Sequence, residues 1–233
     1  MALYTISDLH LPLGVNKPMD IFGSAWSNYV ERLRDNWQST VKPEDTVVLG
    51  GDFSWATYLE EAAADFEFLN GLNGKKILLK GNHDYWWTTM NKLGGFLDGR
   101  GISNIGFLHN NYYMYGNIAV CGSRGWNVPM GGQTEEDKKI YSRELCRLEA
   151  SIASAQKENP RETVVFLHYP PLLRDFRENP MTALLKKNGV KRCYYGHIHK
   201  NGSQNAFTGK SGGILYMLCS CDYLGFMPIL VAE

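Results

Sequence analysis

The segment KILLKGNHD, residues 76–84, shows the pattern on which the fold prediction rests. It starts with a mainly apolar run of strand length, and the polar residues Asn82, His83 and Asp84 follow directly after a glycine. Glycine tolerates a tight turn at the end of a strand and leaves space beside the next side chains. In open α/β sheets, binding and catalytic sites form at the carboxyl ends of the strands. We therefore predict a strand over 76–79 that ends in a functional site.

Four other mainly apolar runs lead into polar side chains in the same way. These runs, at 2–6, 46–49, 163–167 and 190–195, are also of strand length. Five of the six histidines lie in the segments that follow the five predicted strands. A chance distribution would scatter the histidines along the chain, so the pattern indicates one shared site. The polar residues that follow the four runs are Asp8, His10, Asp52, His168, His197 and His199.

Amphipathic stretches separate most of the predicted strands. In these stretches apolar residues recur at helical spacing, and capping signals mark two of the helix starts. Residues 105–121 are typical of short antiparallel strands, and residues 214–231 of a final hairpin-like pair of strands. The predicted helices lie at 26–37, at 59–69, between Thr134 and Pro160, and between Asn179 and Gly189.

The alternation of strands and helices predicts an α/β layered fold. The strand pattern alone fits either a doubly wound single sheet or two packed sheets. We find no low-complexity linker, charge block or internal repeat that would divide the chain. Residues 1–233 are therefore predicted to form a single domain.

The bulk composition is that of a soluble globular protein, with 44% hydrophobic and 21% charged residues. The formal net charge is zero, so the sequence has no strong electrostatic footprint for nucleic acid or an anionic membrane. No apolar run approaches the ~18 residues needed to span a bilayer, and the N-terminus does not resemble a signal peptide. The five scattered cysteines fit a reducing compartment. We expect a cytoplasmic protein.

The predicted site offers three kinds of metal donor, namely carboxylate, amide and imidazole. This mixture suits Mn, Fe or Zn ions better than Ca²⁺ or a thiolate zinc site. The candidates outnumber the donors that one ion can use, and a bridging carboxylate would let them hold two ions. Two adjacent ions suit in-line displacement at phosphorus, whereas a mononuclear hydrolase of amides or carboxyl esters would need fewer donors. The candidate metal ligands are Asp8, His10, Asp52, Asn82, His168, His197 and His199.

Five sequence blocks, taken in order, resemble the calcineurin-like metallophosphoesterase superfamily, and in particular its small bacterial-type phosphohydrolases. The pairing of G-N-H-D with a later G-H-x-H is the most specific part of this resemblance. It implies a four-layer α/β/β/α sandwich of two mixed β-sheets flanked by helices. The blocks are D-x-H at 8–10, G-D at 51–52, G-N-H-D at 81–84, the lone His168, and G-H-x-H at 196–199.

The resemblance also implies a role for each site residue. One metal ion would be bound by Asp8, His10 and His199, the other by Asn82, His168 and His197, and Asp52 would bridge the two ions. His83 would be catalytic, protonating the leaving oxygen or stabilising charge on the phosphoryl group, and Asp84 would orient it. The implied cofactors are two divalent or trivalent transition metal ions, Mn, Fe or Zn.

The implied activity is hydrolysis of a phosphodiester or a small-molecule phosphomonoester through a hydroxide that bridges the two ions. Asp52 is followed by Phe53, Ser54, Trp55 and Ala56, so the D-R-G motif of protein Ser/Thr phosphatases is absent and that branch is disfavoured. The same Trp55 stands where many cyclic-nucleotide phosphodiesterases carry a second acid. The alternative function is a catalytically silent interaction scaffold, but such relatives usually lose donors that are intact in this chain.

Two further expectations come from the residues themselves. Arg124 follows an apolar run at the same position as the metal donors, and its guanidinium is suited to bind a non-bridging phosphate oxygen of the substrate. A structural ion pair is the alternative role for Arg124. Four tryptophans near the blocks would form an apolar wall for an aryl or nucleobase group, or would simply pack in the core. They are Trp55, Trp86, Trp87 and Trp126.

Overall fold

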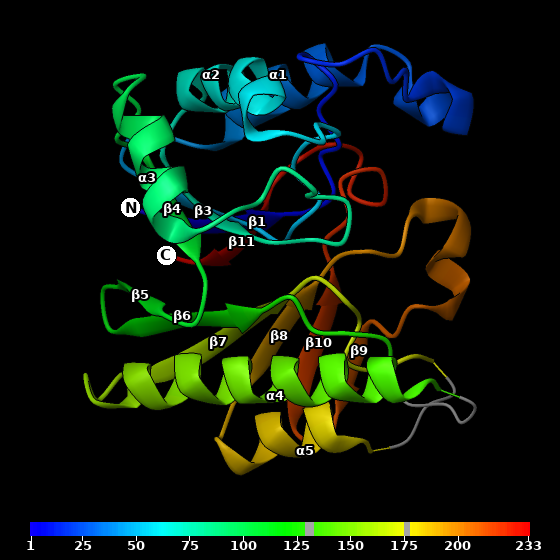
Figure 1. Cartoon of the computed structure of the whole chain (residues 1–233). Helices are drawn as coiled ribbons and strands as arrows, with labels where there is room; N and C mark the ends of the chain where they lie inside the picture. The colour runs from blue at the N-terminus through cyan, green and yellow to red at the C-terminus, as the bar shows by residue number, and fades with distance from the viewer. Residues whose placement is uncertain (129–132, 175–177) are drawn as a thin grey trace.

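Two β-sheets lie face to face in the computed structural model, which describes residues 1–128, 133–174 and 178–233 (Figure 1). In the first sheet, β11 is antiparallel to β1 and the other strands are parallel. In the second sheet, only the edge strands β5 and β9 are antiparallel to their neighbours. The first sheet has the order β11 (Ile229–Ala232), β1 (Leu3–Ile6), β2 (Thr46–Leu49), β3 (Lys75–Leu79) and β4 (Ile105–Leu108). The second has the order β5 (Tyr112–Tyr115), β6 (Ile118–Ser123), β7 (Glu162–Leu167), β8 (Arg192–Tyr195), β10 (Ile214–Leu218) and β9 (Gly209–Ser211).

Helices cover the outer face of each sheet (Figure 1). The first sheet carries α1 (Tyr29–Thr40), α2 (Ala63–Gly71) and α3 (Met90–Asp98), and the second carries α4 (Glu135–Gln156) and α5 (Pro180–Lys187). The predicted four-layer sandwich of two mixed sheets is thereby confirmed. Short 3₁₀ helices occur at η1 (Asp20–Phe22), η2 (Ser24–Trp26), η3 (Leu59–Ala62) and η4 (Lys200–Asn205). None of the helices in the described part of the chain is long and apolar enough to cross a membrane.

Three apolar clusters hold the four layers together, because successive residues of a strand point to opposite faces of its sheet. In β2, Val47 packs under the first helix layer, whereas Val48 faces the second sheet. In β7, Val165 packs toward α4 and α5, whereas Phe166 faces the first sheet. Both faces of each sheet are therefore buried, which explains why the strands read as continuous apolar runs.

The helix starts agree with the sequence signals at two places and differ at two. Of the helix predicted over 59–69, the first turn is the 3₁₀ helix η3 and α2 begins at Ala63, and α3 was not predicted. Thr134 and Asp137 form the predicted capping box at the start of α4, and Asn179 caps α5. The first helix starts later than predicted: α1 begins at Tyr29, and Trp26 belongs to the preceding 3₁₀ helix. Trp26 is therefore free to turn toward the site described below.

Two predicted strand pairings are wrong. The strand β4 is parallel to β3, because α3 carries the chain back along the sheet before β4 begins. The tail is not a hairpin: β10 pairs parallel with β8 in the second sheet, and β11 pairs antiparallel with β1 in the first. Between them the chain crosses from one sheet to the other, and Ser7 binds it on both sides through Cys219 O and Cys221 N–H. The predicted antiparallel pairing of β5 with β6 is confirmed.

The core between the sheets generates a stability prediction. Phe166 is 1% exposed and stacks on Tyr194 with 5.4 Å between ring centroids. Phe166→Ala should lower the free energy of unfolding by about 3–5 kcal/mol, since it leaves a cavity between two packed sheets. Phe22→Ala, at a side chain that is 54% exposed, serves as the control and should change it by less than about 0.5 kcal/mol. Urea denaturation of both variants measures the difference, and equal losses would contradict this account of the core.

Candidate metal centre

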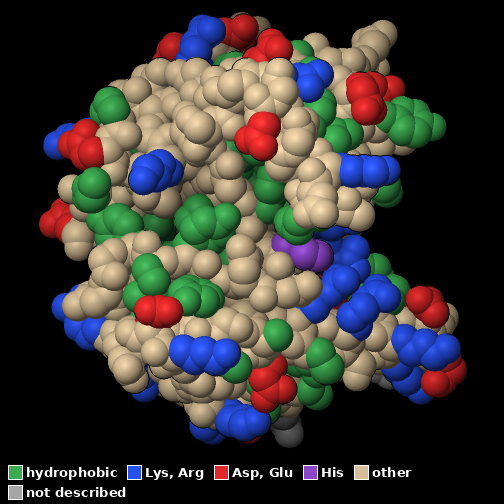
Figure 2. Space-filling model, turned by 60° about the vertical axis from the view of Figure 1, so that its left-hand side comes forward, with side chains coloured by type: hydrophobic (Ala, Val, Ile, Leu, Met, Phe, Trp, Pro, Cys, Tyr) green, Lys and Arg blue, Asp and Glu red, His purple; other side chains and the backbone are tan. Residues whose placement is uncertain are grey.

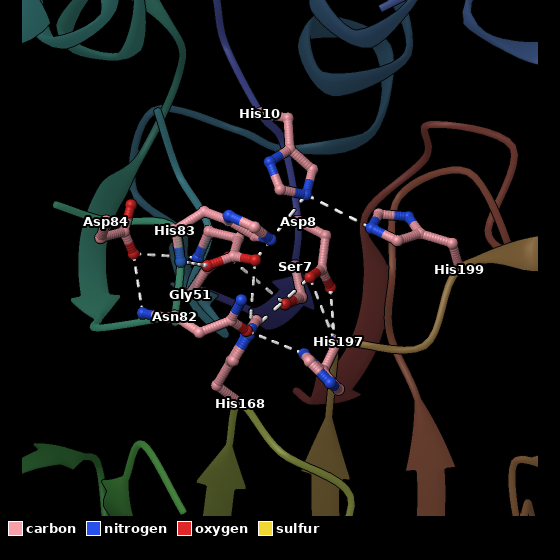
Figure 3. A network of polar contacts seen from close by, with 12 residues as sticks. Ser7, Asp8, His10, Gly51, Asn82, His83, Asp84, His168, His197 and His199 are labelled. Carbon is pink, nitrogen blue, oxygen red and sulfur yellow. Dashed lines mark hydrogen bonds and ion pairs between the residues drawn. The ribbon is translucent and has the colours of Figure 1, made fainter. Parts of the chain in front are cut away.

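The loops after β1, β2, β3, β7 and β8 meet at one edge of the sandwich, where the strand ends of both sheets face each other (Figure 3). Each loop carries one or two of the predicted donors. The structure brings all seven of them into one cluster, and the six that Figure 3 labels have side chains that point toward a common centre. They are Asp8, His10, Asp52, Asn82, His168, His197 and His199.

The first group of donors contains Asp8, His10 and His199. One donor atom from each of these residues lies within 4.8 Å of the other two. The Nε2 atoms of His10 and His199 face each other at 3.3 Å. Two ring nitrogens that face each other in this way can share a bound cation, and an imidazole nitrogen and a carboxylate oxygen are both suitable donors for it.

The second group is built around Asn82. Its Oδ1 lies 2.6 Å from Nε2 of His168 and 2.8 Å from Nδ1 of His197. Asp52 lies between the two groups, because its Oδ2 is 3.4 Å from Nε2 of His168 and 3.8 Å from Nε2 of His10. The donor groups that the resemblance implied for two ions are thus neighbours in space. Asp52 lies near a histidine of each group, and so does Asp8, whose Oδ1 is 3.9 Å from Nδ1 of His168.

The backbone at four of these donors has a left-handed conformation that is rare outside glycine. The φ angles are 60° at Asp8, 47° at His10, 52° at Asp52 and 69° at His197. Such conformations cost on the order of 1–3 kcal/mol each and occur mainly at functional sites, where the surrounding structure imposes them. Here the conformation turns the side chain of each donor toward the centre of the cluster.

Glycines precede three of the donors, and each of them lies too close to a neighbour to carry a side chain. A Cβ atom on Gly51 would lie 2.8 Å from Nδ1 of His168, and one on Gly81 would overlap the carboxylate of Asp52. A Cβ atom on Gly196 would overlap the side chain of Asp8. The prediction that these glycines leave room beside the donors is confirmed.

The carboxylate of Asp84 holds the loops that carry Asp52 and Asn82. It is fully buried and accepts hydrogen bonds from the backbone N–H groups of Asp52, Phe53 and Gly81 at 2.7–2.9 Å. Its partners are therefore backbone groups and the indole of Trp86. The link from Asp84 to His83 runs through the loop, because the His83 N–H donates to Oδ1 of Asp52 at 2.7 Å. An orienting role of Asp84 toward His83 stays a prediction, and the route available for it is the backbone of the loop.

The electrostatics of the cluster favour cations. Burial, followed by the charges of Asp84 and Asp8, raises the pKa of Asp52 well above its ordinary value. Burial lowers the pKa of His168 to about 3 and that of His197 to about 4, so both imidazoles are neutral near pH 7 and keep a lone pair for a metal ion. Neutral imidazoles beside buried carboxylates form a donor set that a positive ion would stabilise.

Comparison with known proteins supports this interpretation of the cluster. A model of the calcineurin-like phosphoesterase family matches residues 1–201. The chain belongs to this family. The family and the Asp/His cluster together support a phosphoesterase that binds metal ions. Comparison with curated protein sequences found no match.

Two solved structures share the fold of this calcineurin-like phosphoesterase. A protein of unknown function from Aquifex aeolicus is 16% identical, with a TM-score of 0.56, and the alignment covers 98% of this chain and 95% of that one. Phosphopantetheinyl hydrolase from Mycobacterium tuberculosis is 13% identical, with a TM-score of 0.55 and coverage of 99% and 95%. At these identities the likeness concerns the fold alone.

Asp222 is a site residue of this phosphoesterase that the sequence analysis missed. It is buried, its Oδ1 lies 3.2 Å from Nδ1 of His199, and its Oδ2 accepts from Lys200 N–H at 2.9 Å. Burial acts to lower the pKa of His199, but the hydrogen bond to Asp222 and the charges of Asp8 and Asp222 outweigh it, and the pKa is raised. The signal was present in the sequence, since Asp222 follows the end of β10 in the same way as the predicted donors follow the ends of their strands.

An apolar cavity of about 300 Å³ opens beside the first group of donors. Its walls include Met19, Phe22, Trp26 and Trp55, and His83 lies at its edge with His10 and His199. Trp55 stacks on the imidazole of His10 with 4.6 Å between ring centroids. Of the four tryptophans considered for an apolar wall in the sequence analysis, Trp55 lines this cavity. Trp26 also lines it, but the sequence analysis did not predict this role.

The other three tryptophans lie elsewhere. Trp86 is 2% exposed and packs on Phe66, and Trp87 is buried against Phe107, so both belong to the core under the first helix layer. Trp126 packs on Tyr169 near the second group of donors. Core packing is therefore the observed role of Trp86 and Trp87.

Arg124 stands next to the cluster, but its guanidinium contacts other residues. Its Nη2 lies 3.8 Å from Oε1 of Glu144, and the guanidinium sits 4.7 Å above the ring of Trp126. The ion pair that was the alternative role for Arg124 is thus present. Binding of substrate by Arg124 stays a prediction.

The close approach of Gly81 to Asp52 yields a test of the metal centre. Gly81→Ala should displace the Asp52 carboxylate and reduce the Mn²⁺ retained per chain after reconstitution and dialysis to less than half. Gly94→Ala is the matched control, because nothing lies within 4 Å of a Cβ atom at that position in α3, and it should retain as much Mn²⁺ as the unchanged protein. Elemental analysis measures both, and equal metal contents would contradict the assignment of Asp52.

The hydrogen bond between Asp222 and His199 yields a second test. Asp222→Asn should weaken Mn²⁺ binding by about 10–100-fold, because the carboxylate that orients a metal-binding imidazole also raises its basicity. Asp98→Asn changes an exposed carboxylate in α3 and should leave the Mn²⁺ dissociation constant unchanged. Calorimetric titration with Mn²⁺ gives both constants. An Asp222 variant that binds like the control would remove Asp222 from the site.

Proposed function

We propose that this protein is a metal-dependent phosphoesterase that hydrolyses a phosphodiester or a small-molecule phosphomonoester at a centre for two transition metal ions. One observation carries the proposal: seven carboxylate, amide and imidazole donors from five separate loops converge on one point. The number and kinds of donors favour two ions of Mn, Fe or Zn over a single ion.

The donors divide into two sets that would each hold one ion. Asp8, His10 and His199 form the first set, and Asn82, His168 and His197 form the second, with Asp52 between them. When bound, such a pair of ions provides Lewis acidity that activates water and neutralises charge on a phosphoryl group. The chain contributes the fixed positions of the donors, which the left-handed turns and the close glycines maintain.

His83 is placed to transfer a proton to the leaving oxygen. Its imidazole is half-buried at the edge of the apolar cavity, beside the stacked rings of His10 and Trp55, at centroid distances of 5.7 and 4.8 Å. Burial lowers the pKa of His83 below its ordinary value, which makes its protonated form a stronger acid. Its backbone N–H is bonded to Asp52, so the ring is held at a constant position relative to the donors.

The apolar cavity supports a substrate with an apolar or aromatic part beside the ester. Met19, Phe22 and Trp26 form walls next to His10 and His199, so a group attached to a phosphoryl centre at the donors would extend along them. Aromatic walls favour flat groups, because stacking adds to the free energy gained from burial of apolar area.

We further propose that the protein acts in the cytoplasm. Its cysteines are free, and four of them, Cys121, Cys193, Cys219 and Cys221, are buried as thiols. This state fits a reducing compartment.

The test of the proposed function is hydrolysis of bis-p-nitrophenyl phosphate and p-nitrophenyl phosphate after reconstitution with Mn, Fe or Zn. Asp52→Asn should abolish both activities and reduce bound metal, whereas Asp98→Asn should change neither. His83→Ala should lower kcat by about 10²–10⁴-fold and leave the metal content unchanged, because the imidazole acts on the leaving oxygen and is not a donor. Absence of hydrolysis with every metal and ester would favour the silent scaffold, and a His83 variant with full activity would remove the assigned proton donor.

A further inference from the structure

A second cavity, of about 240 Å³, lies beside the metal centre and is lined by basic side chains. It opens between the ends of β3, β4 and β6 and one face of α4. Figure 2 shows a hollow in which Lys and Arg side chains gather beside a histidine. The titratable residues that line this basic cavity are Lys80, His109, Arg124, Arg143, Glu144 and Arg147.

The basic cavity holds four cationic side chains and a single carboxylate. Glu144 is fully buried, and its Oε1 pairs with Arg147 at 2.7 Å and with Arg124 at 3.8 Å. Among the described residues, no carboxylate lies within 4.0 Å of the charged atoms of Lys80 or Arg143. The positive charge therefore exceeds what Glu144 neutralises, although the chain as a whole has no net charge.

Polar atoms in the basic cavity also lack partners. Nε of Arg124, a donor, and Oε2 of Glu144, an acceptor, are both buried and make no hydrogen bond within the part of the chain that the structure describes. Burial, followed by the charge of Arg147, lowers the pKa of His109, so burial and a nearby cation both disfavour its protonated form. A buried donor without a partner and a surplus of like charges both cost free energy, and an anion in the cavity would remove both costs.

Two of the cations are attached to the loops of the metal centre. Lys80 directly precedes Gly81 and Asn82, and the backbone carbonyl of Arg124 accepts hydrogen bonds from the N–H groups of His168 and Tyr169 at 3.1 and 2.9 Å. The walls of the basic cavity are therefore joined through the backbone to the loops that carry the second group of donors, although none of those donors lines the cavity. The apolar cavity, by contrast, adjoins the first group.

We propose that the basic cavity binds a phosphate group, and that it serves as a subsite for a second phosphoryl group of the substrate. The second part of this inference, the role as a substrate subsite, rests on the proposed function. Arginine guanidinium groups bind phosphate oxygens in a bidentate way, and Arg143 is free of any carboxylate partner in the described residues. The substrate class is thereby narrowed to esters that carry a second phosphate besides the one that is cleaved.

Binding of inorganic phosphate tests the first part. The metal-loaded protein should bind phosphate at two sites in calorimetric titration, and chelation of the metals should remove one of them. Arg143→Gln and Arg147→Gln should each weaken the remaining site by at least about tenfold, because each removes a charged hydrogen-bond donor. Arg143→Lys should restore part of the affinity. Arg34→Gln, on the distant helix α1, is the control and should bind like the unchanged protein.

A pair of ligands tests the second part. Glucose 1,6-bisphosphate should bind the metal-loaded protein at least about tenfold more tightly than glucose 1-phosphate, and Arg143→Gln should remove this advantage while leaving unchanged the constant for glucose 1-phosphate at the metal centre. Two results would overturn the phosphate site. One is the loss of both phosphate sites when the metals are chelated, and the other is equal phosphate binding by Arg143→Gln and Arg34→Gln. Equal affinities for the two sugars would overturn the substrate subsite. Failure of the proposed function would appear separately, as absence of ester hydrolysis with phosphate binding retained.

Discussion

The structure depends on the burial of two carboxylates, Asp8 and Asp52, among four imidazoles. Both side chains are almost completely removed from water, and among the described residues no lysine or arginine pairs with them. Burial of a carboxylate without a cation beside it costs free energy, so a positive charge at this point would stabilise the folded chain. The left-handed backbone at the donors, the close glycines and the hydrogen bonds of Asp84 all keep this arrangement in place. We infer that metal binding and local stability are linked here.

The surroundings of the centre are asymmetric, and the substrate class that we propose follows from this asymmetry. On one side, aromatic walls adjoin His10 and His199, and on the other, cations adjoin the loops of Asn82 and His168. A molecule with a phosphoryl group at the donors would meet an apolar surface in one direction and positive charge in the other. The formal net charge of zero does not reveal the positive side, because basic and acidic residues cancel over the whole chain.

Much of the candidate site could be predicted from the sequence, because its donors occupy one repeated position, immediately after a strand. The same rule, applied to the end of β10, also finds Asp222. The contacts of Arg124 and of the tryptophans could not be predicted in this way. Proximity in sequence to a site block does not decide which way a side chain points: Trp86 packs in the core, whereas Trp55 lines the apolar cavity.

The sequence by itself determined most of the strands and helices, the α/β class and the candidate donors, since these depend on local periodicity and on residue chemistry, whereas α3 and β9 were not predicted. Only the tertiary structure decided how the strands divide between two sheets. Strands buried on both faces have the same apolar pattern in either arrangement, so β10 and β11 look like partners in sequence and yet lie in different sheets. Pairing is chosen by contacts between distant segments, such as Ser7 with the chain after β10, and those contacts leave no local signal.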